Sequence, residues 1–348
     1  MSRLKKTFLY LLNKIPSRRL FRFYFSKQHT NNIGMVVALH RITAAGTHTD
    51  QSALNSFIEM TGSRLEETII NLQKLNVKFI ALSELPACLQ NDPTEKKPFV
   101  HFSFDDGYLD NATLAYPILK KYHIPFSIFV TSSFIDNRRP FTWWYIIEAI
   151  IKNERELSFI KYDYSISQRD YQAKEKSKIF EDMVLFILAN IDNDRSYFEQ
   201  ALTEQAQNLP EEAIPKMMCW ADLNNMVSTG LCELGIHTNS HARFRDITTE
   251  EKRKEILLCK EAIRANTGIS SKYFAYPYGA KEDIGSREGL KEMLKDCGIE
   301  MAFTTIPGEL NKAADKFFIP RILINNNATM YTLKSRLNGT YQRGINGG

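Results

Sequence analysis

The chain has 348 residues, of which 43% are hydrophobic and 24% are charged, so it is long and apolar enough to bury a large globular core. Its formal net charge is +5, and the excess is confined to residues 1–28, which hold eight Lys or Arg and no acid. The rest of the chain has 37 basic and 40 acidic residues. Because this body is slightly acidic and carries no recognition motif, we expect no nucleic-acid partner.

The cysteines indicate a reducing environment. They are odd in number and have no Cys-x-x-Cys spacing, which favours reduced thiols in the cytoplasm over a disulfide framework or a thiolate metal site. The five are Cys88, Cys219, Cys232, Cys259 and Cys297.

Residues 1–33 form a basic amphipathic arm, in which Lys and Arg are interleaved with aromatic and aliphatic side chains. No apolar run reaches the roughly 18 residues of a membrane span, and no small-residue cleavage site follows. Two interpretations stay open: residues 1–28 lie on an anionic membrane surface, or they form a helix that packs its apolar side on the domain. We therefore expect a cytoplasmic protein, with peripheral contact at the inner face of the membrane as one alternative.

Beyond the arm, strands alternate with helices. A first strand at 34–41 is followed by a helix to about Leu75, for which Ser63 and Glu66 have the spacing of a capping box. Further elements are expected in the order strand 77–80, helix 82–89, strand 98–104, helix 112–122 and strand 126–130. This alternation predicts parallel βαβ units, whose polar strand ends collect at one face of a sheet or barrel.

The strand at 98–104 stops on Asp105, Asp106 and Gly107, and this stretch organises the chain. Successive side chains of an extended segment diverge, so one aspartate can bind a metal while the other stays free as a base. Gly107 allows the backbone to turn sharply. Asp-Asp-Gly is also ordinary turn chemistry, so a purely structural turn remains the alternative at this point.

Residues 134–216 break the rhythm and are interpreted as a helical insertion. Trp143, Trp144 and Tyr145 open a segment of charged, helix-favouring sequence without a strand of comparable quality. The insertion could shape a substrate cleft. The two tryptophans either stack on a sugar or pack the insertion on the barrel.

The rhythm resumes with a helix at 220–229 and a strand at 232–236, which runs into His237 and His241. Histidines four apart fall on one face of a helical turn and can converge on one metal. Alone, this spacing is a weak signal. Both histidines follow a strand, as Asp106 does, and together the three would make a two-histidine, one-carboxylate site with open positions.

The last part of the chain supplies a turn and further strands. A strand at 272–276 meets Pro277 and Gly279 and must end in a fixed turn, where freed backbone N–H groups could face an oxyanion. The remaining expected elements are helix 250–267, helix 286–297, strand 301–305, strand 317–324 and a flexible Gly- and Asn-rich tail at 338–348.

Three motifs now stand in order: Phe-Asp-Asp-Gly-Tyr at 104–108, His-Thr-Asn-Ser-His at 237–241 and Pro-Tyr-Gly at 277–279. Together they resemble the polysaccharide deacetylases of the nodulation-deacetylase-like group, carbohydrate esterase family 4. The resemblance covers about 34–133 and 217–325. It implies an α/β fold, an irregular (β/α) barrel formed by 34–133 and 217–337 and interrupted by the helical insertion.

The resemblance also implies a metal-dependent site. Asp106, His237 and His241 would hold a divalent metal, and Asp105 would be the general base that takes a proton from the attacking water. Zinc fits this ligand set, as do cobalt, nickel and manganese. The backbone N–H of Tyr278 would help the metal to stabilise the oxyanion.

The sequence departs from the family pattern twice. Where the third motif commonly has an arginine, Ala275 stands here, and no histidine follows His241 to match the late Leu-x-His motif. We hypothesise that His40 is the general acid, in an order that resembles the permuted members that deacetylate poly-N-acetylglucosamine, and that Arg321 takes the place beside Asp105. A capping or core role for His40 is the alternative.

The predicted function is removal of an N-acetyl group from a sugar during the biosynthesis of a capsule, lipopolysaccharide or related surface glycan. The expected partner is an N-acetylated sugar or glycan precursor, activated or lipid-linked. The alternatives are a catalytically inactive carbohydrate-binding barrel and an O-acetyl esterase. Asp105 argues against the binding protein, because binding alone requires no free carboxylate beside a metal ligand.

Overall fold

The computed structural model describes residues 32–44, 54–90, 97–137, 140–191 and 194–338. The predicted N-terminal arm and C-terminal tail therefore lie almost entirely outside the described residues. Within these ranges, none of the helices combines the length and the hydropathy of a membrane-spanning segment.

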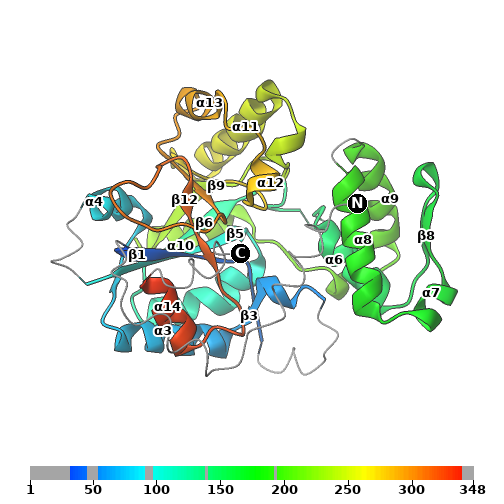
Figure 1. Cartoon of the computed structure of the whole chain (residues 1–348), viewed down its shortest axis with the longest axis horizontal. Helices are drawn as coiled ribbons and strands as arrows, with labels where there is room; N and C mark the ends of the chain where they lie inside the picture. The colour runs from blue at the N-terminus through cyan, green and yellow to red at the C-terminus, as the bar shows by residue number, and fades with distance from the viewer. Residues whose placement is uncertain (1–31, 45–53, 91–96, 138–139, 192–193, 339–348) are drawn as a thin grey trace, which may run out of the picture.

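The core of the molecule is a parallel barrel (Figure 1). Its strands are β1 (Gly34–Leu39), β5 (Phe99–Asp106), β6 (Phe126–Val130), β9 (Cys232–Ile236), β10 (Tyr273–Ala275), β11 (Met301–Thr304), β12 (Ile319–Pro320) and β13 (Ile322–Leu323), with β4 (Lys78–Phe79) beside the start of β5. The order is β12-β11-β10-β9-β6-β5-β1-β13. Because β12 pairs with β11, β13 pairs with β1, and only Arg321 separates them, one split strand closes the ring. The predicted irregular (β/α) barrel is confirmed.

The strands alternate between two apolar environments. On β1, Met35 and Val37 face a large cluster shared with the outer helices, whereas Val36 belongs to an inner cluster with Phe129 and Phe303. This period-two alternation explains why the strands read as nearly continuous apolar runs: both faces are buried.

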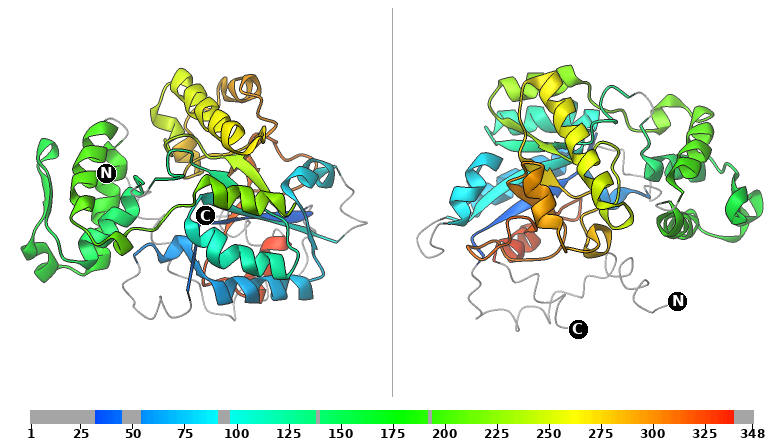
Figure 2. Two further views of the ribbon diagram at one scale, coloured as in Figure 1. Left: turned by 180° about the vertical axis from the view of Figure 1, so that it is seen from behind. Right: turned by 90° about the horizontal axis from the view of Figure 1, so that it is seen from above.

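Helices surround the barrel on its outside (Figures 1 and 2). They are α3 (Gly62–Lys74), α4 (Leu85–Leu89), α5 (Tyr116–Lys121), α10 (Trp220–Ser228), α11 (Thr249–Thr267), α12 (Lys281–Ile284), α13 (Leu290–Asp296) and α14 (Met330–Leu337). A short parallel pair, β2 (Arg41–Thr43) with β3 (Glu59–Thr61), extends from the end of β1.

Three local predictions need correction. Helix α3 is capped by Thr61, whose side chain accepts the N–H of Arg64 at 3.2 Å, because Thr61 ends β3 in an extended conformation and Ser63 is already helical. The helix expected at 112–122 begins as a π-helical segment at Asn111–Ala115, and the one expected at 286–297 begins only at Leu290.

The segment predicted as a helical insertion contains α6 (Trp143–Lys152), α7 (Gln168–Ala173), α8 (Lys176–Asn190) and α9 (Arg195–Gln207). These helices stand to one side of the barrel in every view (Figures 1 and 2) and have their own apolar cluster. The segment also holds an antiparallel hairpin, β7 (Leu157–Phe159) with β8 (Tyr164–Ile166), which was not predicted. Packing of Tyr164 on Phe186 of α8, with ring centroids 3.9 Å apart, stabilises a hairpin too short to show a pattern of its own.

Candidate active site

The predicted site residues lie at the carboxyl ends of the barrel strands, where a parallel barrel gathers polar groups. In the turns there, four residues other than glycine have left-handed backbone, with φ of 74° at Asp106, 67° at Thr238, 58° at His241 and 60° at Tyr278. Such conformations cost about 1–2 kcal/mol each and are concentrated at functional sites. The surrounding fold therefore holds these side chains in strained but defined positions.

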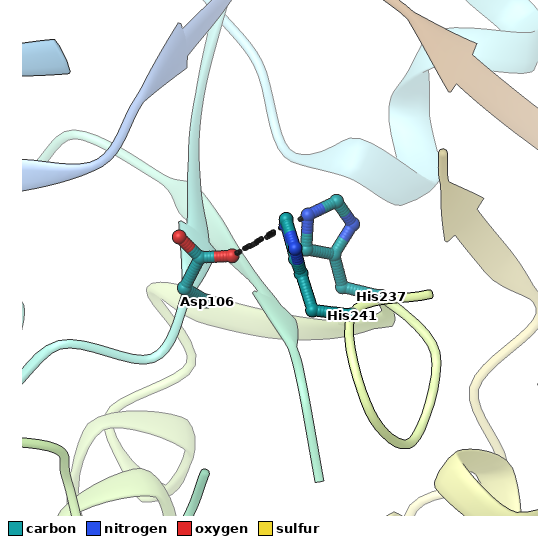
Figure 3. Close-up of side chains that lie close together, drawn as sticks. All are labelled: Asp106, His237 and His241. Carbon is teal, nitrogen blue, oxygen red and sulfur yellow. Dashed lines mark ion pairs between the residues drawn. The ribbon is translucent and has the colours of Figure 1, made fainter. Parts of the chain in front are cut away.

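Asp106, His237 and His241 converge (Figure 3). Oδ1 of Asp106 lies 3.5 Å from Nε2 of His237 and 3.4 Å from Nε2 of His241, and all three side chains are buried. The histidines do not share a helical turn as predicted. They lie in a loop, and the left-handed residues Thr238 and His241 bring the second ring back beside the first.

The donor set of this cluster fits a divalent metal ion. Among the described residues, Oδ1 of Asp106 has no hydrogen-bond partner although it is buried. Nδ1 of His237 lies 2.7 Å from the carbonyl oxygen of Ala275, which fixes the proton there and leaves Nε2 as a lone pair directed at Asp106. Two imidazole nitrogens and one carboxylate oxygen suit zinc and its first-row neighbours.

Burial sets the protonation of these groups. Burial, with the neighbouring charge of Asp105, raises the pKa of Asp106 to about 8, against a hydrogen bond from the Tyr108 hydroxyl that lowers it. Burial lowers the pKa of both His237 and His241, so the two imidazoles are neutral at pH 7. The metal-free cluster must therefore lose a single proton, from Asp106, to become a full ligand set.

Asp105 has the opposite pKa shift to Asp106. Burial would raise its pKa, but the charge and hydrogen bonds of Arg321, together with the neighbouring His237 and His40, outweigh burial and lower the pKa of Asp105 well below its usual range. Nη1 and Nη2 of Arg321 donate to Oδ1 at 2.7 Å and to Oδ2 at 2.8 Å. The split strand that closes the barrel places Arg321 here, while Ala275 contributes only its carbonyl to His237.

His40 lies at the end of β1 with Nε2 4.0 Å from Oδ2 of Asp105. Its Nδ1 has no hydrogen-bond partner among the described residues, so this atom does not cap a helix or strand end. Burial lowers the pKa of His40 to about 4, against the charge of Asp105. The backbone carbonyl of His40 accepts from Nδ2 of Asn111 at 2.7 Å. Its role as general acid stays a prediction.

Tyr278 lies in the turn after β10, with its ring 4.8 Å from that of His241. The N–H of Thr305 donates to the carbonyl of Gly279 at 2.9 Å and anchors this turn. A Cβ on Gly279 would lie 2.9 Å from the nitrogen of Thr305, so only glycine fits there. Use of the Tyr278 N–H as an oxyanion donor stays a prediction.

A family model described as polysaccharide deacetylase matches residues 92–302. The chain belongs to the polysaccharide deacetylase family. A poly-beta-1,6-N-acetyl-D-glucosamine N-deacetylase of Staphylococcus epidermidis is 32% identical over 114 residues, which are 30% of this chain and 38% of that protein. The protein of the same name from Escherichia coli K12 is 23% identical over 285 residues, 81% of this chain and 36% of that protein. The chain thus spans well under half the length of these curated relatives.

Solved structures of polysaccharide deacetylases share the fold. IcaB from Ammonifex degensii has a TM-score of 0.53 at 16% identity, over 88% of this chain and 99% of that one. Deacetylase PplD of Streptococcus pyogenes in complex with acetate has a TM-score of 0.57 at 14% identity, with the same coverage. At these identities the likeness supports the barrel architecture alone.

The candidate site contains contacts that the sequence did not predict. The Tyr108 hydroxyl accepts the indole N–H of Trp144 at 3.2 Å, and Nδ2 of Asn111 donates to the backbone carbonyl of His40 at 2.7 Å. Tyr108 ends the first motif and Asn111 lies three residues after it, and only these positions could have pointed to either residue. Trp143 and Trp144 are 4% and 8% exposed, so their rings pack against the site and present little surface for stacking on a sugar.

Proposed function

We propose that the protein is a metal-dependent hydrolase that removes the N-acetyl group from a glucosamine unit of a surface glycan or its precursor. One observation carries the proposal: the carboxylate of Asp105, held by two hydrogen bonds from Arg321, lies next to the buried cluster of Asp106, His237 and His241. A binding protein has no need of that pairing. The names of the curated relatives support an N-acetylglucosamine polymer as the class of substrate.

The chain's own residues divide the work as follows. A divalent ion held by Asp106, His237 and His241 would acidify a water and polarise the acetamide carbonyl. Asp105 is ionised at neutral pH and can accept the proton of the attacking water, while the two bonds from Arg321 fix the carboxylate. When the C–N bond breaks, acetate leaves and the amine takes up a proton. The proton that Asp105 took from the water is the one that the amine gains, and His40, 4.0 Å from Asp105, would relay it.

Acetate release tests this proposal. Zinc-loaded protein is offered β-1,6-linked N-acetylglucosamine oligomers, nucleotide-linked and lipid-linked N-acetyl sugars, and an O-acetylated sugar. Wild type should release acetate from an N-acetyl substrate, and Asp105→Asn should not. Asp296→Asn is the matched control, because that aspartate is paired with Arg253 at the surface. Zinc binding without acetate release from any substrate would favour the inactive carbohydrate-binding barrel. Release from the O-acetyl sugar alone would favour the esterase.

We also propose that residues 1–28 bring the protein to an anionic membrane surface at the inner face of the membrane. The support is the sequence of this segment, with eight bases and no acid. The full chain should co-sediment with vesicles that contain phosphatidylglycerol, less so at high salt, and a chain without residues 1–28 should not. Equal binding by both chains would refute this role.

A further inference from the structure

We infer that the first turn of α6, made of Trp143, Trp144 and Tyr145, is a positioning element that sets the geometry of the active site from within the insertion. The inference deepens the proposed deacetylase function and rests on it. Successive helical residues point about 100° apart, so three neighbours can reach three different walls. Each of these three rings makes a polar contact with a different segment outside the insertion.

The contact of Trp144 leads to a metal ligand. Its indole Nε1–H donates to the Tyr108 hydroxyl at 3.2 Å, and Tyr108 follows Asp106 by two residues. A phenol oxygen that accepts from the indole keeps its own proton free for another acceptor. The Trp144 ring also lies 5.1 Å from that of His241. Trp144 thus holds the first motif through Tyr108 and lies beside a second predicted metal ligand.

The contact of Trp143 leads to the third motif. Its Nε1–H donates to the Tyr278 hydroxyl at 3.0 Å. The Tyr278 backbone is left-handed, and its ring packs 4.8 Å from His241. Fixing the far end of this side chain therefore fixes the turn whose N–H is the predicted oxyanion donor.

The contact of Tyr145 leads to the segment of His40. Its hydroxyl donates to Oε1 of Glu59 at 3.0 Å, and the same oxygen accepts from Nη1 of Arg41 at 3.2 Å. The Arg41 guanidinium also lies 5.2 Å from the centre of the Tyr145 ring. Since Arg41 directly follows His40, the contact ends one residue from the predicted acid.

Apolar packing alone does not account for this arrangement. All three side chains are buried, and burying an indole N–H or a phenol hydroxyl is costly unless a partner is present. Phe or Leu would fill the same space without that requirement. Instead, the polar atoms of three consecutive residues each meet a partner: in the first motif, in the third motif, and on Glu59, which in turn binds Arg41 next to His40.

Zinc affinity tests the Trp144 contact without any need for turnover. Trp144→Phe keeps most of the ring and removes the N–H, and it should weaken Zn²⁺ binding by about 10- to 100-fold, as loss of partners of metal ligands usually does. Trp220→Phe is the matched control, because the third tryptophan of the chain lies at the start of α10. Affinity is measured by competition with a chromophoric chelator at pH 7. An unchanged affinity of Trp144→Phe would overturn the inference.

A double-mutant cycle distinguishes an effect of Trp144 on zinc binding through Tyr108 from a general destabilisation of the site. If Trp144 acts through Tyr108, Tyr108→Phe should weaken zinc binding at least as much, and the double variant should be no weaker than Tyr108→Phe alone. Fully additive losses would show that Trp144 acts by another route. Tyr108→Phe removes one oxygen only, so it keeps the test available if Trp144→Phe does not fold.

Turnover separates the other two contacts. Trp143→Phe should lower kcat while zinc affinity stays at the wild-type level, and Tyr145→Phe should shift the pH profile of kcat through the segment of His40. Wild-type kcat and pH profile in both variants would limit the positioning role to Trp144 and overturn the inference for the turn as a whole. Failure of the proposed function has a different signature. Wild-type protein would then bind zinc but release no acetate, while Trp144→Phe would still weaken zinc binding as expected.

Discussion

The barrel and the insertion differ in what they bring to the active site. From the barrel come the ionisable groups at strand ends, and two of these, Asp105 and Asp106, are neighbours with opposite pKa shifts. From the insertion come aromatic rings, whose polar atoms contact Tyr108, Tyr278 and Glu59 and none of the predicted metal ligands directly. The insertion thus reaches the site through neighbours of the ionisable groups, whereas Arg321 and Ala275 orient Asp105 and His237 from within the barrel.

Different neighbours explain how adjacent aspartates acquire different predicted tasks. Asp105 faces Arg321 from the closing strand, and Asp106 faces the two imidazoles. Tyr108 belongs to the apolar cluster of the insertion, although it follows a barrel strand. The first motif therefore joins the barrel to the insertion within a few residues.

The largest effect should come from the barrel at His40. His40→Ala removes the predicted general acid, so we expect turnover to fall by about 10²- to 10⁴-fold. Zinc affinity should not change, because His40 is not among the clustered ligands. Steady-state acetate release and chelator competition measure the two quantities. Unchanged turnover would mean that His40 has only a structural role. The proton donor to the departing amine would then be unassigned.

Arg321→Ala should reduce both stability and activity. It leaves Asp105 buried without its partner, so the free energy of unfolding should fall by about 3–5 kcal/mol in urea titrations. Because Arg321 lowers the pKa of Asp105 and burial raises it, the variant should need a higher pH to ionise the base. The acidic limb of the activity profile should move upward.

A substitution in the insertion provides the comparison for Arg321→Ala. Phe159→Ala empties a fully buried position among aromatic rings and should cost a similar amount, about 3–5 kcal/mol. Its activity profile should keep the wild-type pH dependence, since no ionisable site residue is touched. A shifted acidic limb in Phe159→Ala would mean that stability loss alone moves the profile, and the assignment of Arg321 would fail.

Metal binding should depend on pH through one group. The pKa of Asp106 is raised to about 8, so its carboxyl is protonated in the metal-free protein at pH 6–7 and must lose that proton on binding. The neutral histidines contribute no proton. Zinc affinity should fall up to about tenfold for each pH unit below 8, with about one proton released, as calorimetry in two buffers of different ionisation enthalpy would measure. A pH-independent affinity between pH 6 and 8 would contradict the raised pKa.

The sequence was sufficient to predict the barrel and the convergence of Asp106, His237 and His241, because both depend on short stretches. Asp105, Asp106, His237 and His241 each follow an apolar strand, and a parallel barrel necessarily gathers strand ends. The contacts of α6 could not be predicted, since Trp143 and Tyr278 are 135 positions apart and nothing local links them. The loop of the second motif was also mistaken for a helical turn, because spacing does not reveal left-handed backbone.

The smallest expected effect is at the start of α3, where the cap predicted from residue spacing differs from the cap set by the backbone conformation. Spacing favoured Ser63 as the cap, but Thr61 accepts the N–H of Arg64. Thr61→Ala should therefore lower the free energy of unfolding by about 1 kcal/mol, and Ser63→Ala should change it by less than about 0.5 kcal/mol. Urea titrations of both variants measure the difference. If Ser63→Ala were the more damaging, the helix would start two residues later than the structure shows, and the predicted capping box of Ser63 and Glu66 would be correct.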